Sequence, residues 1–211
     1  ALSPLEVLTN YSITYNTADF SITKKEASVT PNVASKIYGG SDPMLAGTLS
    51  GFLEADGVTA TYSRTEGETV LNSPYSISST LSPIDVLSNY DVTYNTALFS
   101  INKKPASVSP VAATKVYGDL NPTLSGALTG FLVADGITAT YGRTLGETVT
   151  IVPYSISAVL QPTNLLDNYD ITYNLADFTI TQAQLHASAD NQSRLYGENN
   201  PNFTISYSGF K

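Results

Sequence analysis

Apolar and polar residues alternate along most of this chain with a period of two. Residues 106–109, 137–141 and 154–157 place apolar side chains at every second position, with Ser or Thr between them. Such alternation is typical of a strand with one face on the core and one in water. The same alternation over 169–173 and 178–181, two segments joined by a short turn, predicts a β-hairpin.

No segment shows a sustained period of 3.6 residues, so the predicted class is all-β. The single helical candidate follows Ser82-Pro83 and again Gln161-Pro162, where Pro suits the first position of one or two helical turns. Gly126 and Gly130 predict bulges or close backbone approach. The sequence Ala134-Asp-Gly136 predicts a turn, because Gly adopts positive φ without strain.

Every landmark returns 79 residues later, without insertion or deletion. Tyr38-Gly39, for example, recurs as Tyr117-Gly118 and Tyr196-Gly197. A fixed period predicts a tandem array of similar modules. Two complete repeats, 26–104 and 105–183, are identical at 45 of 79 positions.

Two partial repeats flank the complete ones. Residues 1–25 match the end of a repeat and 184–211 match its beginning. The chain therefore reads as a window on a longer polypeptide. Pieces this short bury too little surface to form a core. We expect them to be frayed, docked on their neighbours or completed by another copy of the chain.

Six strands are expected in each 79-residue repeat. This number favours a small two-sheet sandwich of immunoglobulin type, with a β-grasp-like sheet as the alternative. About six residues, including Pro105, separate the last strand of one repeat from the first of the next. Short junctions predict an elongated rod that advances by roughly 35 Å per repeat.

Composition narrows the class of protein. The chain has no Cys, which excludes disulfides and thiolate chemistry, and His186 is its single His, an expected exposed strand residue. The net charge of −8 argues against nucleic acid as a partner. No apolar run is long enough to span a bilayer, so we expect no membrane insertion of this segment. These features favour a secreted or surface-displayed β protein.

One ordered string occurs in both repeats. It runs from Lys36-Ile-Tyr-Gly-Gly-Ser-Asp-Pro43 through the Asp56-Gly57 turn and Arg64-Thr-Glu-Gly-Glu68 to Asn89-Tyr90 and Phe99-Ser-Ile101. The string resembles the MBG domain of bacterial surface proteins, in its Tyr-Gly-X type. That family occurs as tandem repeats in large secreted adhesin-like proteins. The resemblance implies an extracellular or cell-surface stalk or adhesive segment.

The recurring tyrosines are the first candidates for a binding site. Tyr38, Tyr117 and Tyr196 each stand beside a Gly turn, where an aromatic ring can stack on a sugar. The competing interpretation, which we favour, is that these side chains fill the core at a turn that needs Gly. A residue that recurs in every module more often has a structural role than a role in specific ligand binding.

The recurring charges have similar alternatives. Asp42, Asp56 and Asp135 stand in turns, but no Asp-x-Asp-x-Asp cluster supplies the six to eight oxygens that calcium needs. Arg64 with Glu68 and Arg143 with Glu147 predict local ion pairs. Lys36 and Lys115 could form isopeptide bonds, but the third copy has Arg194 at this position. We therefore predict no metal and no cofactor.

No Ser, Lys or carboxylate set has the spacing of a nucleophile and its base, so we expect no enzyme activity. The function that the sequence predicts is a stalk or fibre segment that spaces or displays other domains. Its partners would be neighbouring repeats of the same polypeptide. Two alternatives remain: an adhesive module for glycan or a host surface protein, and a filament that self-assembles by strand complementation between copies.

Overall fold

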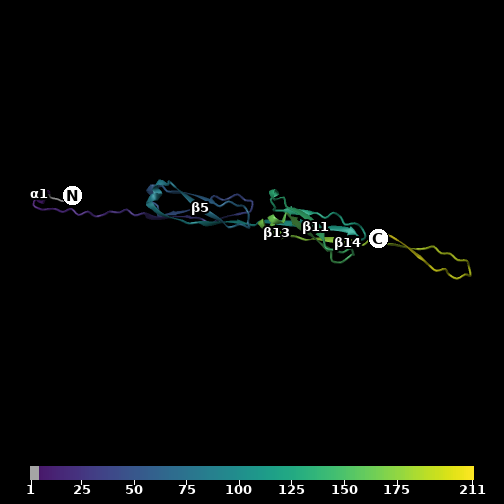
Figure 1. Cartoon of the computed structure of the whole chain (residues 1–211). Helices are drawn as coiled ribbons and strands as arrows, with labels where there is room; N and C mark the ends of the chain where they lie inside the picture. Colours follow the sequence, from purple (N-terminus) through teal and green to yellow (C-terminus); the bar gives the residue numbers. More distant parts are fainter. Residues whose placement is uncertain (1–4) are drawn as a thin grey trace. The chain divides into compact units, whose positions relative to one another are not determined.

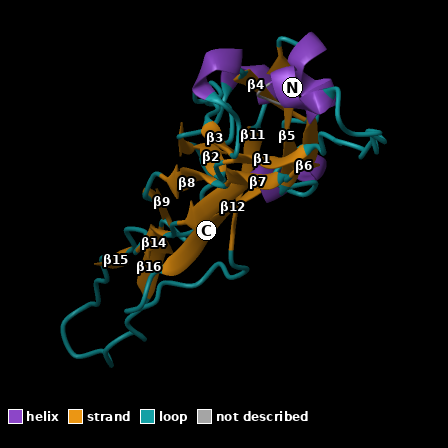
Figure 2. Ribbon diagram, turned by 90° about the vertical axis from the view of Figure 1, so that its left-hand side faces the viewer, coloured by secondary structure: helices purple, strands orange, loops and turns teal. Residues whose placement is uncertain are grey.

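The computed structural model describes residues 5–211, in which strands predominate and helical turns are short (Figures 1 and 2). The chain divides into two compact units. The first holds the residues up to Val33, Leu45–Arg64 and Ser76–Ala97, and the second holds Ala34–Met44, Thr65–Tyr75 and Leu98–Lys211. The second unit thus combines the whole second repeat with parts of the first. Within residues 5–211, no helix has the length and apolarity to cross a membrane.

The second repeat has seven strands, β8 to β14, in two sheets. The three-stranded sheet has the order β10-β8-β13, formed by Gly126–Thr129, Lys104–Pro110 and Tyr169–Tyr173. The four-stranded sheet has the order β11-β12-β14-β9, formed by Thr138–Arg143, Tyr154–Gln161, Ala176–Thr181 and Ala113–Val116. Two pairings are parallel, β8 with β13 and β14 with β9.

The core of this repeat lies between the two sheets. Val108 of β8, Ile156 of β12 and Phe178 of β14 are completely buried. Strands β8 and β12, which belong to different sheets, contact each other across the interior. Successive side chains of a strand point to opposite faces, so the apolar positions of the alternation meet in this layer. The predicted all-β fold of small, immunoglobulin-like sandwich modules is confirmed.

The first repeat forms the same pairings. In the first unit, β1 (Lys25–Pro31) pairs with β3 (Gly47–Ser50) and in parallel with β6 (Tyr90–Tyr94), and β4 (Thr59–Arg64) pairs with β5 (Tyr75–Ser82). In the second unit, β2 (Ala34–Ile37) pairs in parallel with β7 (Ala97–Asn102). The registers agree after a shift of one period, since Val29 faces Tyr94 as Val108 faces Tyr173.

The predicted hairpin of residues 169–181 is wrong. β13 pairs with β8 in one sheet, whereas β14 pairs with β12 and β9 in the other. The turn between β13 and β14 crosses from sheet to sheet, and Asn174 holds it on β8. Its N–H donates to Val108 O at 3.0 Å and its Nδ2 to Ser109 Oγ at 3.0 Å. Alternation alone could not distinguish the two topologies, because both bury the same faces.

The structure contains the helical turns and the glycine positions that the sequence predicts between the alternating segments. The helical candidate forms short 3₁₀ helices, η2 (Asp85–Asn89) and η4 (Thr163–Asn168). The Ala134-Asp-Gly136 turn is the 3₁₀ helix η3 (Val133–Asp135), which ends at Gly136 with φ 60°. Gly126 approaches backbone as expected, since a Cβ there would lie 2.5 Å from Ser109 O. The repeat has seven strands instead of six, and two of them, the four-residue strands β9 and β10, lie outside the alternating segments, where they pair with β14 and β8.

The partial repeats bury little. Helix α1 (Leu5–Leu8) buries no residue, and no strand forms between residues 9 and 24. β15 (His186–Ala189) and β16 (Ile205–Ser208) form a hairpin that is exposed throughout, so His186 is the exposed strand residue that the sequence predicts. Residues 1–4 of the first partial repeat lie outside the described part of the chain.

Candidate functional site

Each Tyr-Gly loop of the complete repeats is a tight turn at the end of a parallel strand pair. Tyr38 follows β2, and its N–H donates to Asn102 O of β7 at 2.9 Å. The next residue, Gly39, has φ 75°, a value that L side chains rarely adopt. Tyr117 repeats this arrangement, with its N–H on Thr181 O at 2.8 Å. The backbone of the turn is therefore the same in both repeats.

Tyr38 packs against residues of the second repeat, and all of these residues belong to the second compact unit. Its hydroxyl donates to the Asp135 carboxylate, with Oη 3.1 Å from Oδ2 and 3.3 Å from Oδ1. Its ring meets the Tyr169 ring edge-on, with centroids 5.4 Å apart and planes at 77°. Tyr38 is only 9 % exposed. The tyrosine of one repeat is thus buried by the next.

The surface that receives Tyr38 is braced by its own hydrogen bonds. Tyr169 donates to Asp135 and accepts the Leu132 N–H at 3.0 Å. Phe131 packs on the Tyr169 ring, with centroids 4.9 Å apart. Asp135 ends the 3₁₀ helix η3 and Tyr169 begins β13, so these two element ends hold the carboxylate and the phenol side by side.

Two further contacts complete this interface. The Val70 N–H donates to Asn168 Oδ1 at 3.0 Å, and Asn168 is only 3 % exposed. Leu132 closes over Gly39, because a Cβ at that position would lie 2.4 Å from Leu132 Cδ1. Glycine is needed here for space as well as for its φ. We call Leu132, Asp135, Asn168 and Tyr169 the acceptor site of the second repeat.

The acceptor site keeps its tyrosines neutral. Burial, and then the hydrogen bond to Asp135, raises the pKa of Tyr169 to about 12. Burial and the bond to Asp135 also raise the pKa of Tyr38. Both hydroxyls therefore remain donors at neutral pH, and a carboxylate that accepts them forms charge-assisted hydrogen bonds. The site can therefore hold a phenol by hydrogen bonds to its hydroxyl.

A second polar cluster lies behind the Tyr-Gly loop of the second repeat. Glu147 accepts hydrogen bonds from both Lys115 and Arg143. The pKa of Glu147 is lowered, chiefly by the hydrogen bond from Lys115. The Arg143 guanidinium also lies over the Phe178 ring, 4.5 Å from its centroid. The predicted Arg143–Glu147 ion pair is confirmed. Lys115 additionally donates to Asp119 O at 3.1 Å, so the cluster fastens the loop to the sheet.

The equivalent cluster of the first repeat includes Asp42, one of the candidate metal ligands of the sequence. Lys36 pairs with Asp42 at 2.7 Å and with Glu68. Burial alone would lower the pKa of Lys36, but the hydrogen bonds to Asp42 and Glu68 outweigh it and the pKa is raised. A protonated amine is a poor nucleophile, which argues against an isopeptide bond at Lys36.

The remaining candidate residues have protein partners or exposed side chains. Asp56 accepts from Tyr90, as Asp135 accepts from Tyr169. Tyr117 is 42 % exposed and Tyr196 is fully exposed. Among residues 5–211, the structure shows no group of three or more His, Asp or Glu side chains that could hold a metal ion. Among these candidates, the structure therefore brings Tyr38 and Asp135 together.

Two features of the site were missed in the sequence. Asn168 had no assigned role, and Tyr38 was expected in the core of its own repeat instead of against Asp135. A signal existed: the Tyr-Gly, Asp-Gly and Asn-Tyr pairs all recur with one period, and each lies near a strand end. Such residues are candidates for contacts between modules as much as within them.

Comparison with known proteins defines the class. The family model for the MBG domain (YGX type) matches residues 27–100 and 106–179, more than half of the chain. The chain therefore belongs to the MBG domain (YGX type) family, with two tandem copies. The solved structure of Sidekick-1 immunoglobulin domains 1–4 is 10 % identical, with a TM-score of 0.28, and the match covers 85 % of this chain and 59 % of that one. No curated protein matches the chain.

Proposed function

We propose that this chain is a structural stalk segment of a secreted or cell-surface bacterial adhesin-like protein, which spaces or displays other domains. The contact of Tyr38 with Asp135, Asn168 and Tyr169 carries the proposal. It is a specific, buried polar and aromatic contact made by residues that recur in each repeat. A chain of independent modules on flexible linkers would not need such a contact.

The connection between the repeats supports this proposal. β7 ends at Asn102 and β8 begins at Lys104, so Lys103 is the single residue between them. A one-residue connection leaves little freedom for hinge motion. Membership of the MBG family, together with the acidic, Ser- and Thr-rich composition, supports an extracellular location. Enzyme activity is not part of the proposal.

Small-angle X-ray scattering of the chain tests the stalk. We expect a maximum dimension well above that of a globule of the same mass, because the modules succeed one another at roughly 35 Å per repeat. Tyr38→Ala should broaden the distance distribution by releasing the contact, whereas Tyr196→Ala, at a fully exposed loop, should not. A compact particle, or identical profiles for both variants, would contradict the proposal.

An adhesive function is the second candidate, and the exposure of Tyr117 favours it. Of the three tyrosines in Tyr-Gly loops, Tyr38 is engaged with protein, whereas Tyr117 and Tyr196 expose their rings. Binding on a glycan array that disappears in a Tyr117→Ala, Tyr196→Ala double variant with intact fold would support this function. Binding that persists would assign it elsewhere.

A further inference from the structure

The first two and the last two strands of the second repeat run side by side in the same direction. Residues 104–108 of β8 pair in parallel with 169–173 of β13, and residues 113–116 of β9 pair in parallel with 178–181 of β14. Only two residues connect β8 to β9, and only two connect β13 to β14. We call residues 104–116 the entry path and residues 169–181 the exit path, since each is one extended stretch that changes sheet halfway.

The two paths stay joined where they change sheet. Asn174 lies in the connection between β13 and β14, and its N–H donates to Val108 O at 3.0 Å. Its Nδ2 donates to Ser109 Oγ, also at 3.0 Å. At the far end, the Tyr117 N–H donates to Thr181 O at 2.8 Å. Hydrogen bonds between the entry and exit paths therefore extend from the start of β8 to the end of β9.

Both paths are also anchored in the core of the repeat. Val108 of the entry path and Phe178 of the exit path are completely buried. Lys115 of the entry path reaches Glu147, which belongs to neither path. If one path slid along the other, these side chains would leave their packed positions while the hydrogen bonds between the paths broke.

The chain enters the repeat at one end of these pairs and leaves it at the other. Lys104 lies opposite Tyr169 at the start of both paths, and Thr181 lies opposite Val116 at their end. A pull on the two ends of the repeat therefore drags the paths in opposite directions along their own lengths. The hydrogen bonds run between the strands, so they share this shear load and must break together. A pull across the strands would break them one at a time.

The first repeat has the same pairs in the same register. Residues 25–29 pair in parallel with 90–94, and residues 34–37 with 99–102. β7 ends at Asn102 and β8 begins at Lys104, so a pull passes from the last strand of the first repeat to the entry path of the second through Lys103 alone.

We propose that the parallel strand pairs of each repeat form a mechanical clamp, which lets the chain carry tension along its length without unfolding. The inference goes beyond the proposed stalk function, because a spacer needs only length, whereas a clamp needs strength in one direction. It rests on that function for the load that the chain would carry. The register of the paths, with entry and exit at opposite ends, is the observation that supports it.

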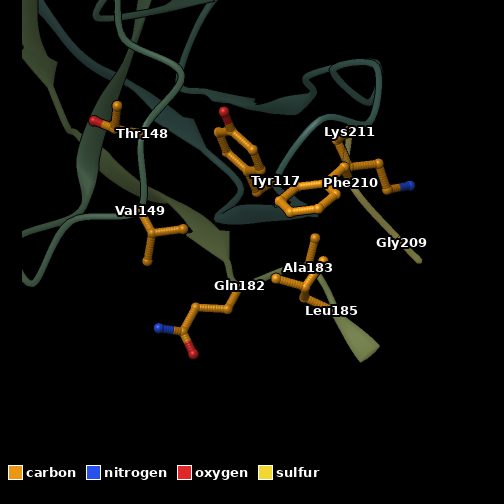
Figure 3. A pocket seen from close by; sticks show the side chains of 9 residues that line it. All are labelled: Tyr117, Thr148, Val149, Gln182, Ala183, Leu185, Gly209, Phe210 and Lys211. Atoms are coloured by element: carbon orange, nitrogen blue, oxygen red, sulfur yellow. The ribbon is translucent and has the colours of Figure 1, made fainter. Parts of the chain in front are cut away.

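Single-molecule force spectroscopy of the complete chain in two directions tests the clamp. The chain has no Cys, so two introduced cysteines define where the handles attach. Lys103→Cys with Gln182→Cys loads the two paths in shear, whereas Lys103→Cys with Asp170→Cys pulls β8 and β13 apart from one end. All three residues are exposed. Figure 3 shows the Gln182 side chain pointing away from Tyr117, so a handle there leaves the end of the exit path intact.

The direction of the pull should decide the rate of unfolding. At the same constant force, the second repeat should unfold at least about tenfold more slowly in shear, because several hydrogen bonds must break together. Urea unfolding has no direction and should not distinguish the two double variants. Equal rates in the two directions, or faster unfolding in shear, would overturn the clamp. Neither result would touch the scattering test of the stalk, which depends on shape.

Asn174→Ala supplies a second test within the clamp. The substitution removes the bond to Ser109 Oγ and keeps the N–H bond to Val108, so it should raise the unfolding rate in shear about fivefold. The rate should change less when β8 and β13 are pulled apart from their other end. Leu175→Ala, in the same turn and 67 % exposed, is the matched control and should leave both rates unchanged. An equal effect of Asn174→Ala in both directions would overturn the assignment of Asn174 to the clamp.

Discussion

The two Tyr-Gly loops of the complete repeats share their local conformation and differ in their surroundings. Tyr38 and Tyr117 both follow a short parallel strand, precede a Gly with positive φ and donate their N–H to the strand beside them. Yet Tyr38 is 9 % exposed and Tyr117 is 42 % exposed. The partner that each ring meets decides the difference. A recurring residue can therefore stabilise the contact between two modules instead of the core of its own module.

The largest effect should come from removing the buried ring. Tyr38→Ala deletes an aromatic side chain and its bonds to Asp135, and we expect it to lower the free energy of unfolding of the second unit by about 3 kcal/mol. The matched Tyr117→Ala should cost less than about 1 kcal/mol, because the side chain is already half-exposed. Urea denaturation followed by tyrosine fluorescence measures both. Equal costs would break the comparison between the two loops.

Removal of the Asp135 carboxylate should destabilise the protein more than removal of the Asp56 carboxylate, although the difference should be smaller than that between the two tyrosines. Asp135→Ala leaves both Tyr38 and Tyr169 without their acceptor, which should cost about 2 kcal/mol. Asp56→Ala deprives Tyr90 of its acceptor, with an expected cost of about 1 kcal/mol. A double-mutant cycle of Tyr38→Phe with Asp135→Ala should give a coupling of about 1 kcal/mol. A coupling near zero would mean that the Tyr38–Asp135 bond contributes nothing.

The leucines sharpen the comparison further. Leu132 packs on Gly39, whereas Leu53 is 53 % exposed. Leu132→Ala should therefore cost about 1 kcal/mol more than Leu53→Ala, as expected from the extra buried surface. Thermal unfolding of both variants provides the measurement. If Leu53→Ala proved the more costly change, the burial difference would not govern stability.

The last expected effect concerns the dependence of stability on pH in alkali. The folded pKa of Tyr169 is raised to about 12, above the value of about 10 for an unfolded chain, so folding favours the neutral phenol. The resulting stabilisation is complete below pH 10 and is lost as the pH rises towards and through 12. Tyr169→Phe should flatten this part of the stability profile. Ultraviolet titration should show a late-ionising tyrosine that this variant lacks.

Much of the fold was accessible from the pattern. The two-residue alternation located β8, β11, β12, β13 and β14, and the Gly positions located the turns. The pairing of β13 and β14 was not accessible, because consecutive strands joined by a short turn can pair or can separate into two sheets. Asn174, which donates to Val108 O and Ser109 Oγ, selects the second arrangement. That choice depends on contacts across 65 residues.

The candidate site was accessible only in part. Tyr38, Asp56 and Asp135 were all noted as recurring polar or aromatic turn residues, but they were considered one at a time as sugar or metal ligands. The structure combines Tyr38 with Asp135, 97 positions away. It adds Asn168, which the sequence did not single out. Chain separation this large carries no local pattern, so neither pairing could be deduced from spacing.

By itself the sequence determined the period, the class of fold and the membership of the MBG family, because these follow from repeated local preferences and from motif order. The tertiary structure decided which sheet each strand joins and which tyrosine is buried. Those outcomes depend on the surface that meets each side chain, and similar local sequences can meet different surfaces. The two Tyr-Gly loops show this directly, since they differ in burial while keeping the same turn.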